Sequence, residues 1–83
     1  MVISPDVVFR VLGDEAVLVD LATNQVFELN ATAAAAWQRL SQGDAPDAVI
    51  AALVARFDVD PDTAHREVHT LLQDLERRGL LRP

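Results

Sequence analysis

Residues 25–40 read QVFELNATAAAAWQRL, and the hydrophobic period of this stretch changes at Asn30. Before Asn30, apolar and polar side chains alternate as in a half-buried strand, with Phe27 and Leu29 predicted to face inward. After it, small apolar residues recur at helical spacing around Trp37. Because an asparagine side chain accepts a free backbone N–H at the start of a helix, the stretch predicts a strand joined directly to a helix.

Two further strands are predicted upstream of this junction. Residues 7–12 and 15–21 both alternate with a period of two, and each is followed by a turn, at Gly13 and at Asn24. Together with residues 25–29 they predict a three-stranded antiparallel meander with one face against helices. The strand over residues 25–29 is expected to lie at an edge of this sheet.

The rest of the chain has helical periodicity. The first helix is predicted to end near Gly43, the second to run from Pro46 to about Asp58, and the third to follow its N-cap Asp60 and end before Gly79. The inward stripe of the third helix is predicted to comprise Ala64, Val68, Leu71, Leu72 and Leu75. The predicted fold is therefore α+β and winged helix-turn-helix-like, a three-stranded antiparallel meander followed by three helices.

Composition limits the classes of protein to consider. With 83 residues, about half of them apolar, we expect one domain over residues 1–83. The absence of cysteine fits a reducing cytoplasm, and the longest apolar run, residues 48–55, is much shorter than the roughly 20 residues of a membrane span. The first ten residues also lack the pattern of a secretory signal. We expect a cytoplasmic protein whose net charge of −6 disfavours nucleic acid.

No motif for catalysis, metal binding or a cofactor is convincing. Residues 58–69 begin like a calcium-binding EF-hand loop, but Thr63 stands where that loop needs glycine and His69 where it needs glutamate. His65 and His69 are four residues apart, yet "HREVH" is not a zinc-protease motif, so two surface histidines are the simpler interpretation. The serines lack partners at a suggestive spacing, and no glycine-rich phosphate loop is present. We expect no enzyme activity, metal or cofactor.

Three segments in order resemble the PqqD-like family. They are "VLVDLATNQVFELNATAAAAWQRL" (residues 17–40), "PDAVIAALVARFDVDP" (46–61) and "EVHTLLQDLERRGLL" (67–81), and together they cover most of the chain. Members of this family are RiPP recognition elements, which hold the leader of a ribosomally synthesised precursor peptide for a modifying enzyme. The chain lacks the tyrosine- and proline-rich pattern of the pyrroloquinoline quinone (PQQ) protein itself, so both PQQ and lasso-peptide biosynthesis stay open.

The resemblance implies how a leader peptide would bind. The leader would add as a strand beside residues 25–29, antiparallel to them, in a groove against the helix over residues 61–78. The contact residues that it implies are Val26, Phe27, Glu28, Leu29, Glu67, Thr70, Leu71 and Asp74. The partner enzyme implied is a radical SAM enzyme, a leader peptidase or a cyclase.

Simpler interpretations of the same residues stay open at this point. The acids at 67 and 74 also suit a solvated helix face, and an edge strand is often only an edge. A winged-helix DNA-binding regulator would need a basic recognition helix and a cationic wing, which this chain lacks. A scaffold subunit of an enzyme complex is the third alternative. The sequence does not decide whether the chain forms a homodimer.

Overall fold

A computed structural model describes residues 2–82 of the chain. Its main sheet contains β2 (Val7–Leu12), β3 (Glu15–Asp20) and β4 (Gln25–Leu29), paired antiparallel in the order β2-β3-β4. The turns between them use Gly13 and Asn24, whose φ angles of 64° and 59° lie in the left-handed region. The predicted meander is therefore confirmed, and β4 is an edge strand as expected.

Three helices follow directly, as predicted. They are α1 (Ala31–Ser41), α2 (Pro46–Phe57) and α3 (Pro61–Arg77). The side chain of Asn30 accepts the N–H of Ala33 at 3.0 Å, which makes Asn30 the N-cap of α1. The carboxylate of Asp60 accepts the N–H groups of Asp62 and Thr63 at the start of α3. Both α1 and α3 thus begin at a residue whose side chain caps the helix.

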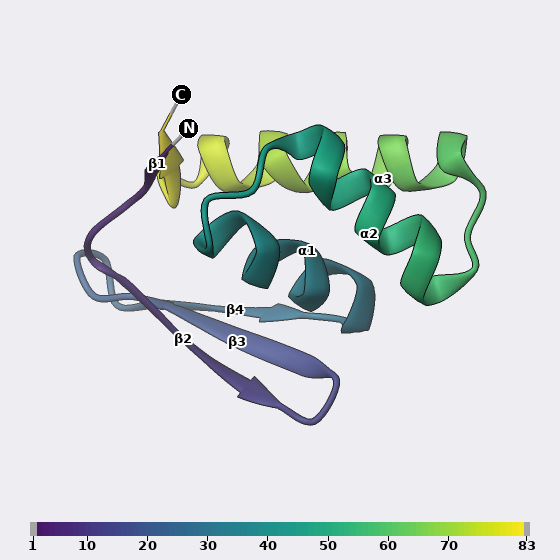
Figure 1. The fold of residues 1–83 in the computed structure, drawn as a ribbon. Helices are drawn as coiled ribbons and strands as arrows, with labels where there is room; N and C mark the ends of the chain where they lie inside the picture. Colours follow the sequence, from purple (N-terminus) through teal and green to yellow (C-terminus); the bar gives the residue numbers. More distant parts are fainter. Residues whose placement is uncertain (1, 83) are drawn as a thin grey trace.

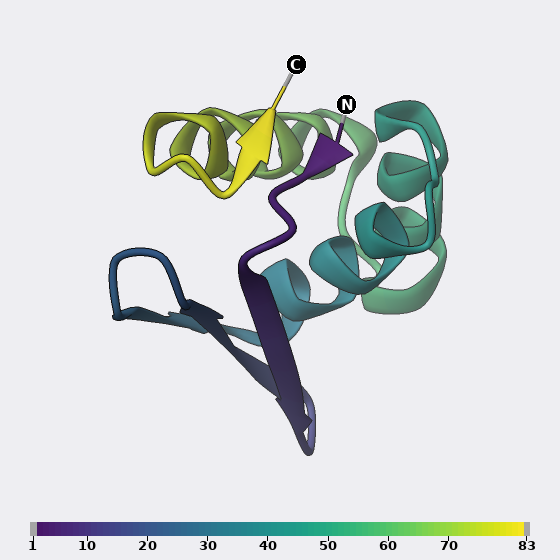
Figure 2. The same ribbon diagram turned by 90° about the vertical axis from the view of Figure 1, so that its left-hand side faces the viewer.

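The helices all lie on one face of the sheet (Figures 1 and 2). Helix α1 packs against β3 and β4 on one side and against α2 and α3 on the other. Its alanines allow this close approach, and Trp37, which is 0% exposed, fills the centre of the core. Phe9 packs against Trp37 in an edge-to-face arrangement, with ring centroids 5.9 Å apart. No helix of residues 2–82 covers the outer face of the sheet.

A second, smaller sheet joins the two ends of the described chain. Strand β1 (Val2–Ile3) pairs antiparallel with β5 (Leu81–Arg82), beside the end of α3 (Figure 2). The backbone N–H of Ser4 also donates to the carbonyl of Leu80 at 3.0 Å. Leu80 and Leu81 are 0% and 3% exposed, so this small sheet closes one end of the core. The sequence did not predict it.

No helix within residues 2–82 combines the length and the apolar character needed to cross a membrane.

Candidate functional site

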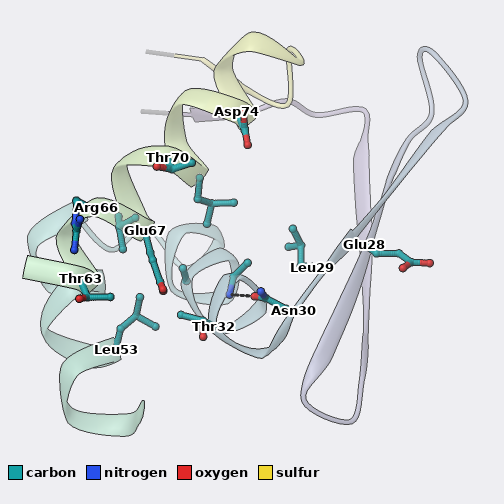
Figure 3. A pocket seen from close by; sticks show the side chains of 14 residues that line it. Glu28, Leu29, Asn30, Thr32, Leu53, Thr63, Arg66, Glu67, Thr70 and Asp74 are labelled. Carbon is teal, nitrogen blue, oxygen red and sulfur yellow. Dashed lines mark hydrogen bonds between the residues drawn. The ribbon is translucent and has the colours of Figure 1, made fainter. Parts of the chain in front are cut away.

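A groove with a volume of about 630 Å³ runs between β4 and α3, with the first half of α1 at its base (Figure 3). Strand β4 pairs only with β3, so along its other edge no further strand is bonded among residues 2–82. An edge strand presents unpaired backbone N–H and C=O groups along its free side. The groove therefore combines a hollow with a row of backbone hydrogen-bonding groups. Its lining comprises Glu28, Leu29, Asn30, Thr32, Ala33, Ala36, Leu53, Thr63, Arg66, Glu67, Val68, Thr70, Leu71 and Asp74.

The floor of the groove is apolar and is formed in part by small side chains. Ala33 and Ala36 of α1 face it, and because a methyl group is the whole of an alanine side chain, they leave the space above them open. Leu53 of α2 closes the floor beneath, at 2% exposure. Leu71 of α3 is half-buried and packs against the core with one side while the other lines the groove. Such a surface suits an apolar side chain of a ligand.

Helix α3 contributes two carboxylates, Glu67 and Asp74, and one guanidinium, Arg66, to the lining of the groove. Glu67 points into it, toward the start of α1 (Figure 3), and forms no ion pair with another described residue. Asp74 lies two helical turns further on and pairs with Arg77 of the same helix at 2.5 Å. Glu28 borders the groove as well, but its side chain points away from it (Figure 3). The acidic groups directed at a ligand in the groove are thus on α3, not on β4.

Comparison with known proteins gives a family for this arrangement. The family model described as "Coenzyme PQQ synthesis protein D (PqqD)" matches residues 15–81. The chain belongs to the PqqD family. This confirms the family resemblance in the sequence. The matched residues include β3, β4 and all three helices, and so the whole lining of the groove of this PqqD-family chain.

Two solved structures have the same fold over nearly their whole length. One, described as TbiB1 in complex with the TbiA(beta) leader peptide, has a TM-score of 0.91 and 34% sequence identity, and the match covers 98% of this chain and 94% of that one. The other, described as lasso peptide synthetase B1 complexed with the leader peptide, has a TM-score of 0.87 and 28% identity, covering 98% and 95%. The predicted fold class is therefore confirmed. The comparison with curated proteins found no match.

Six of the eight contact residues predicted from the PqqD resemblance line this one groove. They are Glu28, Leu29, Glu67, Thr70, Leu71 and Asp74. The other two lie elsewhere. Val26 is on the outer face of the sheet and 61% exposed, whereas Phe27 is half-buried beneath the guanidinium of Arg78, which lies 4.8 Å from its ring centroid. Neither of these two side chains lines the groove.

Eight residues of the lining were not predicted from the sequence. Four belong to the α1 junction and its first two turns, and four to α2 and α3: Asn30, Thr32, Ala33, Ala36, Leu53, Thr63, Arg66 and Val68. The run of alanines was a usable signal, because small residues on a helix that starts beside an edge strand leave room for a ligand as well as for close packing. From the sequence, the alanines indicated only a helix around Trp37.

His65 and His69 form a pair on the exposed side of α3, with ring centroids 4.4 Å apart. Within the described part of the chain, no group of three or more His, Cys, Asp or Glu residues is arranged to hold a metal ion.

Proposed function

We propose that this chain binds the leader region of a ribosomally synthesised precursor peptide and presents it to a modifying enzyme. The leader adds as a fourth strand to the free edge of β4, in the groove against α3. The observation that carries the proposal is the pairing of an open strand edge with an apolar groove, in a fold whose 34% identical relative is described in complex with a leader peptide.

The geometry supplies both parts of such recognition. Backbone bonds to residues 26–28 of β4 provide affinity that does not depend on the leader sequence. Selectivity comes from side chains across the groove: Leu71 and the alanines of α1 receive an apolar leader residue, and Glu67 meets a basic one. In this proposal Val26 and Phe27 contribute main-chain atoms only, which accords with side chains that lie outside the groove.

The proposed role is non-catalytic and cytoplasmic. A leader held along β4 would leave its following segment free for a partner enzyme to modify or cleave. Because both solved relatives are described with leader peptides, and one as lasso peptide synthetase B1, we favour a leader peptidase or cyclase of a lasso-peptide pathway over a radical SAM enzyme.

Fluorescence anisotropy with labelled TbiA(beta) leader peptide tests the proposal. We expect saturable binding that persists at high salt, because the contacts are mainly backbone and apolar, and no binding of a scrambled peptide. A labelled DNA duplex serves as the second control. Binding of the duplex alone, weakening steeply with salt, would support the DNA-binding alternative and overturn the proposal.

A proline pair tests strand addition itself. In an antiparallel strand, successive N–H groups alternate between the two sides, so of residues 27 and 28 one donates to β3 and the other faces the free edge. Phe27→Pro and Glu28→Pro therefore remove one donor of each kind, and Glu28→Ala keeps the donor as a control. The proline variant that stays folded should lose leader binding. Unchanged affinity in both folded variants, and for a leader N-methylated along its backbone, would refute strand addition.

A further inference from the structure

The opposite edge of the main sheet is also open, and it is the most apolar exposed part of the described chain. Strand β2 pairs only with β3, and its hairpin with β3 projects away from the helices (Figure 2). Four of its six residues are large hydrophobics that remain exposed: Val8 at 48%, Phe9 at 42%, Val11 at 42% and Leu12 at 56%. Side chains on both faces of β2 are thus in contact with solvent.

Of the features that normally prevent strand pairing, the edge of β2 has only one charged residue, Arg10. Natural edge strands are protected by charged side chains, above all lysine, and by proline, a bulge or a covering segment. Strand β2 reads VVFRVL, without proline or lysine, and its register with β3 is continuous from Val7 opposite Asp20 to Leu12 opposite Glu15, which leaves no bulge. Among residues 2–82, no other strand bonds its free side. Such an edge is a template for another strand.

We propose that a second copy of this chain pairs with β2, antiparallel, in a register fixed by Arg10. A twofold axis perpendicular to the sheet keeps each residue of β2 on the same face in both copies. Residues on one face of a strand alternate along the chain, so odd-numbered residues pair with odd-numbered ones and even-numbered residues with even-numbered ones. Only two registers then pair five of the six residues of β2, one with Phe9 opposite itself and the other with Arg10 opposite itself.

Charge decides between these two registers. Arg10 is the only charged residue of β2. The register centred on Arg10 places two guanidinium groups directly opposite each other, which is unfavourable. The register centred on Phe9 places Arg10 opposite Val8 of the second copy, so the aliphatic stem of Arg10 covers the exposed side chain of Val8. It also brings the two Phe9 rings together. The same register also pairs Val7 with Val11, so no two like charges face each other across the paired strands.

This dimer leaves both leader grooves free. Because β2 and β4 are opposite edges of the sheet, pairing through β2 makes a six-stranded sheet with a β4 edge at each end. The proposal does not depend on the proposed leader binding. A strand of a different protein could use the same edge, but the sequence of β2 supplies its own complement without opposing charges.

Sedimentation velocity of the whole chain, from about 1 µM to about 1 mM, tests the dimer. Two variants of Val8, whose exposed side chain is outside the core, test its register. Val8→Glu would face Arg10 of the second copy twice per dimer and should tighten dimerisation roughly tenfold, whereas Val8→Lys should weaken it roughly tenfold. Val26→Lys, at the other edge of the same face, is the matched control and should leave the dimer unchanged.

Two results would overturn the proposal. One is a monomer throughout the concentration range, which would assign the β2 edge to a different protein or to none. The other is a dimer that Val8→Glu and Val8→Lys affect equally, as expected if Val8 faced Leu12 or a second Val8, or one that Val26→Lys affects as strongly. Circular dichroism of each variant confirms that it is folded. Opposite responses of the two Val8 variants, with no response of the control, would support the proposed register.

Discussion

Replacing Leu71 by alanine separates the role of the groove in binding from its role in folding. Leu71→Ala removes three carbons, worth about 2.4 kcal/mol at roughly 0.8 kcal/mol each when they are fully buried. Leu71 is mostly buried in the free chain and at most about a third exposed, so no more than roughly 0.8 kcal/mol of this is left for a leader side chain to cover. We expect the Kd of the labelled leader peptide to rise up to about fourfold, and the stability of the free chain to fall by about 1.6 kcal/mol.

The assay is fluorescence anisotropy on protein that urea denaturation shows to be folded. Leu21→Ala is the matched control, because Leu21 is 57% exposed in the turn after β3 and loses the same three carbons outside the groove. Its leader affinity should equal that of the wild type. If Leu71→Ala binds the leader as tightly as Leu21→Ala while showing the expected loss of stability, Leu71 serves only the core and the assignment of its pocket is wrong.

Three further predictions concern charge and capping. Glu67→Lys should weaken binding of a leader probe with an added lysine and strengthen binding of one with an added glutamate, up to about fivefold in Kd, whereas Glu76→Lys on the far side of α3 should do neither in anisotropy titrations. Asn30→Ala should cost about 1 kcal/mol in urea denaturation, whereas Asn30→Asp should retain most of it. The side chain of Thr63, and to a lesser extent its backbone N–H, donates hydrogen bonds to Asp60 and holds the pKa of this carboxyl below its ordinary 3.8. The carboxylate therefore stabilises the fold above pH 3.8, and this stabilisation is lost as the pH falls through the lowered pKa. Asp60→Asn should remove this acid-dependent part of the urea midpoint, measured from about pH 6 to about pH 2.

Local signals explain why most of the fold could be predicted. The strand and helix periods are carried by neighbouring residues, and the helix starts at Asn30 and Asp60 depend on side chains that bond to backbone within three residues. Four of the five residues predicted for the inward stripe of α3 are buried, with Val68 1% and Leu75 3% exposed, whereas Leu71 is partly exposed and lines the groove. These features can be predicted without knowing the contacts between segments that are distant in the sequence.

The features that were missed depend on contacts between distant segments. Strands β1 and β5 have two residues each, too few for a periodic pattern, and exist because the ends of the described chain meet beside α3. The groove floor is formed by α1, α2 and α3 together, so Leu53 enters it from a helix that no local signal connects with β4. The family resemblance predicted the groove, but it could not show that the side chain of Glu28 points away from this groove.

The two edges of the sheet differ because of where the helices end. Helix α1 starts directly after β4, so α1 and α3 flank the β4 edge and turn it into one wall of a groove. Strand β2 lies furthest from that junction in the sheet order, and the helices leave Leu12 and Val8 largely exposed. A flexible peptide gains side-chain contacts in the groove beside the β4 edge, whereas an exposed apolar edge like that of β2 favours a partner that brings a strand and an apolar surface of its own. Because α1 begins directly after β4, with Asn30 as its N-cap, the β4 edge is the one that borders the groove and can select a peptide.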